Sequence, residues 1–203
     1  MKIVLTHMLS QAGMEFLKEH DVEIFVANSN EPSTYLDQLQ NADAFIVRIG
    51  RCDAHIIDRC PNLRVIGRTG VGYDNVDVAY AAKMGIPTVF TPGANHRSVA
   101  EHTIAMMFAL SKDLIASECA LKAGKWELRD AVKAFELFDK KVGIIGVGAI
   151  GRIVAEICQA MGMKTAGFSH SGNRQKVEAA GCEYYTDMHQ LLRDCDIITI
   201  HTH

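Results

Sequence analysis

The residues best suited to chemistry are three glycines, spaced as Gly-x-Gly-x-x-Gly, at the junction between an apolar run and a helical pattern. Gly146 would allow a turn that a side chain would obstruct, Gly148 would let the backbone approach a ligand closely, and Gly151 would let helix and strand pack tightly. The unpaired N–H groups that open the helix, with the positive end of its dipole, would then face an anion. This spacing predicts a site for the pyrophosphate of a dinucleotide.

The surrounding sequence supports this prediction, which three glycines alone would carry only weakly in a chain that has 16. A Val/Ile-rich segment of strand length precedes Gly146, and apolar residues recur at helical spacing from Ile150 to Met161. A second strand pattern, Lys164–Phe168, follows where a βαβ unit requires it. The alternative interpretation is a tight glycine turn that binds nothing.

The composition limits the kinds of partner. The chain has 203 residues, enough for one or two domains, and 48% of them are hydrophobic. A formal net charge of −3 gives no electrostatic reason to expect nucleic acid or an anionic membrane surface as a partner. The most apolar stretch, 103–110, is much shorter than the roughly 20 residues that cross a bilayer. We therefore expect small molecules and other proteins as partners.

The cysteines and histidines show none of the spacings that hold metal ions. No Cys-x-x-Cys pair is present, and no sequence pattern around a cysteine indicates an activated thiolate. We expect reduced, mostly buried thiols in a cytoplasmic protein, and we expect His7 and the other scattered histidines to be ordinary surface or core residues. The cysteines are Cys52, Cys60, Cys119, Cys158, Cys182 and Cys195.

Short β-branched runs alternate with helical patterns in the N-terminal part of the chain. Such alternation predicts parallel strands joined by crossover helices, which form a doubly wound α/β sheet. We expect Ser10, Ser33, Asp53 and Asn75 to cap helices and Gly85 to end one. The expected strands are 2–6, 22–26, 44–47, 64–67 and 88–90, and the expected helices are 11–19, 32–40, 54–59 and 76–83.

A long helix is expected over 98–123, where Ser98 and Glu101 have the spacing of a capping box. The charged segment 125–140, which holds the only tryptophan, Trp126, is expected to cross between two domains. From Lys141 the pattern continues as strand, helix, strand, two helices and a third strand at 196–200, the order of one mononucleotide-binding half. An apolar stripe on the long helix predicts core or interface packing by Ala100, Ile104, Met107, Leu110 and Leu114.

Five motifs in the same order resemble those of the D-isomer-specific 2-hydroxyacid dehydrogenases, and most of all their phosphoglycerate dehydrogenase and hydroxypyruvate reductase branch. Besides the glycine loop they are Arg68-Thr69-Gly70-Val71-Gly72-Tyr73-Asp74-Asn75-Val76-Asp77, Thr91-Pro92-Gly93-Ala94-Asn95 leading into Val99-Ala100-Glu101-His102, Gly124-Lys125-Trp126, and Asp196-Ile197-Ile198-Thr199-Ile200-His201-Thr202. The resemblance implies two doubly wound parallel-sheet domains: a flavodoxin-like substrate domain, 1–96, and an incomplete Rossmann domain for the dinucleotide, 97–203. It also implies NAD(P)-dependent hydride transfer that interconverts a D-2-hydroxy acid and a 2-oxo acid.

The resemblance also assigns residues to the substrate. Val71 and Gly72 match a loop whose backbone N–H groups hold the substrate carboxylate, and a glycine-flanked turn suits that role because no side chain intervenes. A tight turn with a purely structural role is the alternative for this loop. Arg48 and Asn95 are further candidates for facing the substrate.

On the cofactor side, Ala149 and Ile150 match the positions whose amides hold the pyrophosphate. Arg152 would add a cation there or would be an ordinary exposed arginine. Thr202 matches a cofactor contact beyond the last strand, and His201 is expected to be structural.

One position departs from the family pattern. An acidic residue normally follows the second strand, about twenty residues past the glycines, and accepts hydrogen bonds from the adenosine ribose. Ser169 stands there instead, so the repulsion that excludes a 2′-phosphate is absent, and Ser169, His170 and Arg174 offer donors to a phosphate. We therefore expect NAD or NADP as cofactor, with a leaning to NADP.

No catalytic residue and no metal ligand is assigned. In the family the catalytic arginine, glutamate and histidine lie beyond the point that matches His203, so the chain resembles a C-terminally truncated enzyme and is expected to be inactive alone. Glu101 and His102 are not assigned an acid–base role, because adjacent residues on a helix do not face each other.

Two further interpretations concern partners. A dinucleotide-sensing interaction protein of corepressor type shares this architecture and is the alternative function. The resemblance also implies a homodimer, in which Met106, Phe108 and Trp126 would be buried between subunits.

Overall fold

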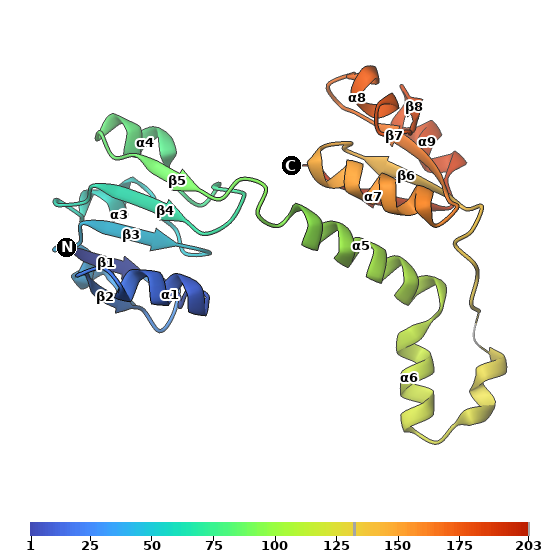
Figure 1. Cartoon of the computed structure of the whole chain (residues 1–203), viewed down its shortest axis with the longest axis horizontal. Coiled ribbons are helices and arrows are strands. Elements are labelled where there is room, and N and C mark those ends of the chain that lie inside the picture. Colours follow the sequence, from blue (N-terminus) through green and yellow to red (C-terminus); the bar gives the residue numbers. More distant parts are fainter. Residues whose placement is uncertain (132, 203) are drawn as a thin grey trace. The chain divides into compact units, whose positions relative to one another are not determined.

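The structure, a computed structural model, describes residues 1–131 and 133–202. The chain forms two compact units, Met1–Ala94 and Asn95–His203, and each is built on its own parallel sheet (Figure 1). The α/β class and the parallel sheets predicted from the alternating pattern are confirmed. No helix in the described parts has both the length and the apolar character needed to cross a membrane.

The first unit contains a five-stranded parallel sheet with the order β2-β1-β3-β4-β5. This is the flavodoxin-like arrangement, in which the chain moves outward from β1 in both directions. The strands are β1 (Lys2–Leu5), β2 (Glu23–Val26), β3 (Ala44–Val47), β4 (Val65–Arg68) and β5 (Thr88–Phe90), and the helices are α1 (Gln11–Lys18), η1 (Pro32–Thr34), α2 (Leu36–Leu39), α3 (Ala54–Asp58) and α4 (Val78–Lys83).

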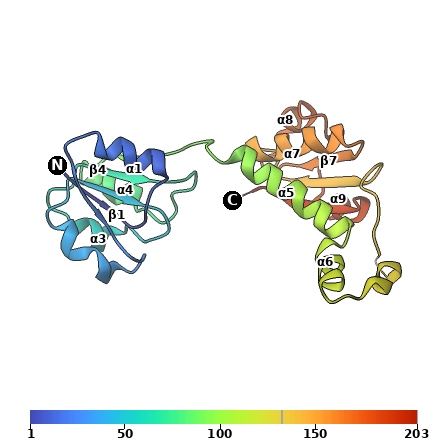
Figure 2. The ribbon, with the colours of Figure 1, turned by 60° about the horizontal axis from the view of Figure 1, so that its bottom comes forward.

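Apolar residues cover both faces of this sheet, as its two-sided winding requires. Met14 and Leu17 of α1 pack against Ile3 and Leu5 on one face. The helices α2, α3 and α4 pack on a separate cluster around Phe45. Figure 2 shows α1 and α3 on opposite sides of the strands.

Local capping explains most of the helix starts. Ser10 accepts from the backbone N–H of Gly13, and Asp53 accepts from that of Ile56, so both predicted caps are confirmed. The predicted cap at Ser33 is wrong, because that residue lies within η1. Asp77 caps α4 in place of Asn75, whose side chain instead binds the loop that follows β3.

The second unit contains a four-stranded parallel sheet with the order β8-β7-β6-β9. The short edge strand β8 was not predicted, because three residues with an exposed glutamate and two tyrosines give no clear alternation. The last strand is therefore the fourth and not the third of this sheet. The elements are β6 (Lys141–Ile145), α7 (Ala149–Ala160), β7 (Lys164–Phe168), α8 (Arg174–Glu178), β8 (Glu183–Tyr185), α9 (Met188–Asp194) and β9 (Ile197–Ile200).

The expected single helix over 98–123 is wrong. The structure has α5 (His96–Ser111) and α6 (Leu114–Lys122), separated at Asp113, whose φ of +49° is left-handed. A distant segment causes the break, because the Phe135 N–H donates to the Ser111 carbonyl and the Phe135 carbonyl accepts from Lys112. Helix α5 then packs along α7.

The predicted capping box is also wrong. Helix α5 begins at His96 after Asn95, so Ser98 lies inside the first turn. The Glu101 carboxylate pairs with Arg97 on the same helix, at 2.8 Å, and does not turn back to the helix start. Of the expected apolar stripe, Ala100, Ile104 and Met107 are buried, whereas Leu110 and Leu114 are exposed.

Candidate functional site

The three glycines lie at the carboxyl end of β6, where the winding of the second sheet changes direction. Strand β6 pairs with β7 on one side and with β9 on the other. In open α/β sheets this switch point leaves a crevice beyond the carboxyl ends of the strands, and ligands bind there. The second sheet therefore places the glycine loop where its topology favours a ligand.

Gly146 is required by both conformation and packing. Its φ is +92°, and a Cβ on it would lie 2.5 Å from the carbonyl oxygen of His201. Its N–H donates to the carbonyl of Phe168 at 2.9 Å, so the residue is held between the ends of two strands. A side chain at Gly146 would displace the chain that follows β9.

Gly151 is required by packing alone. A Cβ on this residue would lie 2.4 Å from the carbonyl oxygen of Gly146 and 3.2 Å from a methyl group of Ile144. The first of these contacts is with backbone, which cannot rotate away. Gly151 thus allows α7 to begin directly against the glycine loop.

Gly148 differs from the other two because neither its backbone angles nor its contacts with the described residues require glycine. Its φ is −86°, which L residues adopt freely, and a Cβ on it would meet no atom of residues 1–131 and 133–202 within 4 Å. The first hydrogen bond of α7 runs from Arg152 N–H to the Gly148 carbonyl, so the amides of Ala149, Ile150 and Gly151 have no acceptor within the helix. Open space in front of free amides at a helix N-terminus fits a pyrophosphate.

Two further predicted cofactor residues, Thr202 and Arg152, lie next to this loop. A Cβ on Gly146 would be 3.1 Å from the Thr202 backbone nitrogen, so Thr202 lies beside the glycine loop. The exposed Arg152 lines a groove of about 700 Å³ that includes Ala149 and runs along α7. His201 is half-buried and binds Thr199 at 2.9 Å, and burial lowers its pKa. These contacts support a structural role for His201.

The segment after β7 contains Ser169, which stands where the family pattern has an acidic residue. Its Oγ lies 3.0 Å from the Oγ of Ser171, so the two hydroxyls form one small polar surface. Arg174 opens α8, and its Nε donates to Glu178 at 2.7 Å. Because Ser169 follows β7 directly, this surface lies at the strand end that adjoins β6.

The predicted carboxylate loop, Val71–Gly72, follows β4 in the first unit. Both residues are half-buried, and within 1–131 and 133–202 neither amide donates to a protein acceptor. Their neighbours are tied down, because the Gly70 carbonyl accepts from Thr91 and the Asn75 amide donates to the Gly50 carbonyl at 2.6 Å. The loop therefore presents free N–H groups on a fixed backbone, an arrangement that suits an anion.

His7 was not recognised as part of this site. Its Nε2 lies 3.2 Å from Thr69 Oγ1, and its Nδ1 lies 3.5 Å from Thr6 Oγ1, which itself accepts the Arg48 N–H. Thr6 can then donate to Nδ1, Nε2–H donates to Thr69, and the Thr69 proton is free to donate outward. Burial and, secondly, the Arg48 guanidinium lower the pKa of His7, which favours this neutral form.

This polar cluster lies in a depression of about 390 Å³ at the carboxyl end of the first sheet. The three residues His7, Arg48 and Thr69 each lie just after a parallel strand. Because the carboxyl ends of parallel strands meet at one edge of a sheet, this placement in the sequence could have predicted that they lie together. Arg68, at the end of β4, has a buried Nε with no hydrogen-bond partner among the described residues, and it donates from Nη1 to the Thr69 carbonyl. The first unit thus gathers guanidinium groups and donors suited to an acid.

The buried thiols are poorly suited to act as nucleophiles. Burial raises the pKa of Cys52 to about 12 and the pKa values of Cys60 and Cys158 to about 11. All six cysteines are free, and Cys119 is the exposed one. No cluster of three metal-ligating side chains occurs in the described part of the chain.

Known proteins resemble the chain over nearly its whole length. It is 35% identical over 201 residues to D-3-phosphoglycerate dehydrogenase from Methanocaldococcus jannaschii, which covers 98% of this chain and 38% of that protein. Among solved structures, D-lactate dehydrogenase from Aquifex aeolicus, complexed with NAD and lactic acid, has a TM-score of 0.83 and 27% identity, covering 100% of this chain and 60% of the other. An acyclic imino acid reductase, Bsp5, in complex with NADPH and D-Arg has a TM-score of 0.81 and 26% identity, with 100% and 65% covered.

The family model for the catalytic domain of D-isomer specific 2-hydroxyacid dehydrogenases matches residues 3–194. The chain spans less than two thirds of the length of each of these relatives. With the glycine loop at the switch point of one parallel sheet and the flavodoxin-like order of the other, the match is decisive: the chain belongs to the D-isomer specific 2-hydroxyacid dehydrogenase family.

Proposed function

We propose that the chain forms the nucleotide-binding and acid-binding parts of an NAD(P)-dependent oxidoreductase that interconverts a D-2-hydroxy acid and a 2-oxo acid. The observation that carries the proposal is the open space at Gly148 in front of the unpaired amides of α7. The relatives support it, because one solved structure contains NAD with lactic acid and another contains NADPH.

The two units have separate roles in this proposal. The unit 95–203 binds the nucleotide through the amides of Ala149, Ile150 and Gly151, and Arg152 adds a positive charge beside the pyrophosphate. The residue Thr202 contacts the cofactor from beyond β9. When bound, the nicotinamide supplies or accepts the hydride, and the residues of this unit hold and orient it.

The unit 1–94 binds the acid. The amides of Val71 and Gly72 hold the carboxylate, and Arg48 and Thr69 offer charge and a hydroxyl donor beside them. The His7 relay orients the Thr69 proton toward the ligand. This assignment rests on the free amides of the loop, on Arg48 after β3 and on Thr69 after β4.

We further propose that NADPH binds at least as well as NADH. Ser169 lacks the carboxylate that would repel a 2′-phosphate, and Arg174 lies five residues away on the same segment. In the Ser169–Ser171 pair one hydroxyl donates to the other, which leaves one hydroxyl proton to donate to a phosphate oxygen.

Replacing Ser169 by aspartate is expected to create a preference for NADH. The new carboxylate would accept hydrogen bonds from the ribose hydroxyls and repel the 2′-phosphate, so the Kd for NADPH should rise about tenfold or more while the Kd for NADH falls. Isothermal titration calorimetry with each nucleotide measures both constants. Ser169→Asn is the control, because asparagine has the shape of aspartate without its charge.

Two outcomes would count against these proposals. A preference of about tenfold or more (~1.4 kcal/mol) of the unaltered chain for NADH would reject the NADP assignment. Absence of binding of either nucleotide at saturating concentration would reject the nucleotide site itself.

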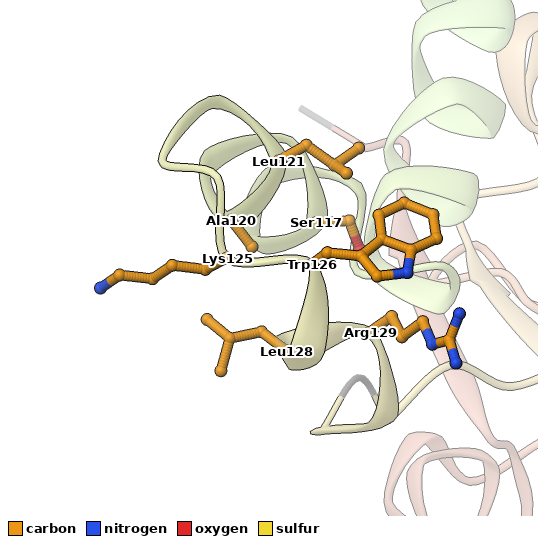
Figure 3. Close-up of a pocket in the computed structure, with 7 residues that line it drawn as sticks. All are labelled: Ser117, Ala120, Leu121, Lys125, Trp126, Leu128 and Arg129. Carbon is orange, nitrogen blue, oxygen red and sulfur yellow. The ribbon is translucent and has the colours of Figure 1, made fainter.

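We also propose that the chain is a homodimer through α5, α6 and η2 (Trp126–Ala131). These elements expose many apolar side chains, among them Leu110 at 77%, Ile115 at 71% and Trp126 at 59%. An apolar depression of about 200 Å³ lies between α6 and η2, where Leu121, Trp126 and Leu128 are exposed. Arg129 Cζ lies 5.4 Å from the centroid of the indole ring of Trp126. Figure 3 shows the residues that line this depression. Exposed aromatic and aliphatic groups on this scale favour association.

A double substitution, Leu110→Glu with Ile115→Glu, is expected to convert the dimer into a monomer. Both side chains are exposed within one chain, so the change should leave the fold intact while it buries charge in the proposed interface. Sedimentation velocity measures the change in mass. Phe16→Glu, at a side chain that is 60% exposed on α1, is the control and should leave the mass unchanged. A monomeric unaltered chain would contradict the proposal.

A further inference from the structure

Arg174 is held by two neighbours at the start of α8. Its Nε donates to Glu178 Oε1 at 2.7 Å, and its Cζ lies 5.9 Å from the ring centroid of Tyr184 on β8. The Arg174 and Glu178 side chains are 70% and 49% exposed, so solvent and solutes reach the pair. The one arginine in the segment that follows Ser169 therefore has a carboxylate bound to it.

The pair stabilises α8, because residues four apart on a helix face each other and opposite charges attract. That role explains the contact in a helix of only five residues, Arg174–Glu178. The helix-stabilising role of the pair leaves open how Glu178 affects the binding of a second anion to the Arg174 guanidinium.

A 2′-phosphate would compete with Glu178 for Arg174. The guanidinium has five N–H donors in a fixed fork, and Glu178 already takes the one on Nε. The carboxylate also brings a negative charge to within a few ångströms of where a phosphate would bind Arg174, and like charges at that separation repel. Both effects act on a nucleotide that has a 2′-phosphate and leave one with a 2′-hydroxyl almost unaffected.

We propose that Glu178 is a specificity-determining residue, which holds Arg174 and thereby weakens binding of a nucleotide that carries a 2′-phosphate. The proposal rests on the nucleotide-binding function proposed above. Ser169 stands where the family pattern has an acidic residue, so in this chain Glu178 would be the carboxylate that opposes the 2′-phosphate. This role fits the proposed binding of both NADH and NADPH.

Glu178→Gln is the direct test. Glutamine keeps the length and a hydrogen-bond acceptor for Arg174 but removes the charge, so α8 should remain folded. The Kd for NADPH should fall about three- to tenfold, whereas the Kd for NADH should change less than about twofold. The gain should shrink as salt is added, because the interaction is between exposed charges. Calorimetric titration of the whole chain with NADPH and with NADH gives both constants.

The chain contains a matched control. Arg97 and Glu101 on α5 form a pair with the same spacing and the same atoms, Nε to Oε1, at 2.8 Å, and with 65% and 60% exposure. Glu101→Gln should leave both nucleotide affinities unchanged. In the double variant Arg174→Gln with Glu178→Gln, the gain in NADPH affinity should disappear, because no guanidinium is left to release.

The outcomes separate this proposal from the function on which it rests. An unchanged NADPH affinity in Glu178→Gln, or an equal change for both nucleotides, would overturn the role of Glu178 and leave the nucleotide site in place. A gain that persists without Arg174 would also overturn it. Failure of the unaltered chain to bind either nucleotide would reject the nucleotide site and this proposal together.

Discussion

Gly148→Asp is expected to abolish nucleotide binding while the protein stays as stable as the unaltered chain or becomes more stable. The two effects have opposite signs because Gly148 is the N-cap of α7, where aspartate caps better than glycine by a few tenths of a kcal/mol to ~1 kcal/mol. In the described part of the chain no atom lies within 4 Å of the new Cβ, so the side chain fits there without strain. The same side chain would occupy the space proposed for the pyrophosphate and repel it, and we expect a loss of about 100-fold or more in affinity.

Calorimetric titration with NADPH and thermal unfolding of the same samples measure both effects. Gly148→Asn separates charge from volume, because asparagine also caps well and fills the space without repelling an anion. Unaltered binding by Gly148→Asp would show that the nucleotide phosphates do not lie in front of α7, and the proposed function would lose its main support.

Gly151→Ala is expected to destabilise the second unit strongly. In most helices this substitution stabilises the protein by about 1 kcal/mol, because alanine has the higher helix propensity. Here the new methyl group would lie 2.4 Å from the Gly146 carbonyl oxygen, so α7 and the glycine loop would have to separate. We expect the free energy of unfolding to fall by about 2–4 kcal/mol, within the range for strained overpacking.

Urea denaturation followed by circular dichroism measures this loss. Gly13→Ala in α1 is the comparison, since the Cβ there would meet no atom closer than 3.2 Å and only side-chain atoms. Helix propensity favours alanine there and the 3.2 Å contact opposes it, so the effect should stay within about 1 kcal/mol in either direction. Equal effects of the two substitutions would contradict the packing role assigned to Gly151.

These two glycines show what the sequence could and could not predict. The spacing predicted the dinucleotide loop because strand, turn and helix are encoded within a few consecutive residues. It also assigned close ligand approach to Gly148 and packing to Gly151, and the clash distances agree with both roles. It did not reveal that Gly146 lies against the His201 carbonyl oxygen, because that contact involves the chain beyond β9. Only the folded sheet brings those atoms together.

Other differences also have long-range causes. The sequence around Asp113 continues a helical pattern, and the break after α5 results from hydrogen bonds to Phe135, more than twenty residues away. The polar cluster at His7 joins the ends of three strands, so no local spacing reveals it. Strand β8 is three residues long and is defined mainly by its pairing with β7.

The distribution of the thiols has a practical consequence. Four cysteines are buried and Cys195 is partly covered, which leaves Cys119 on α6 as the accessible one. A maleimide dye would therefore attach mainly at that position without any engineered mutation. Because α6 belongs to the proposed dimer interface, the rate of labelling at Cys119 would report whether that surface is covered.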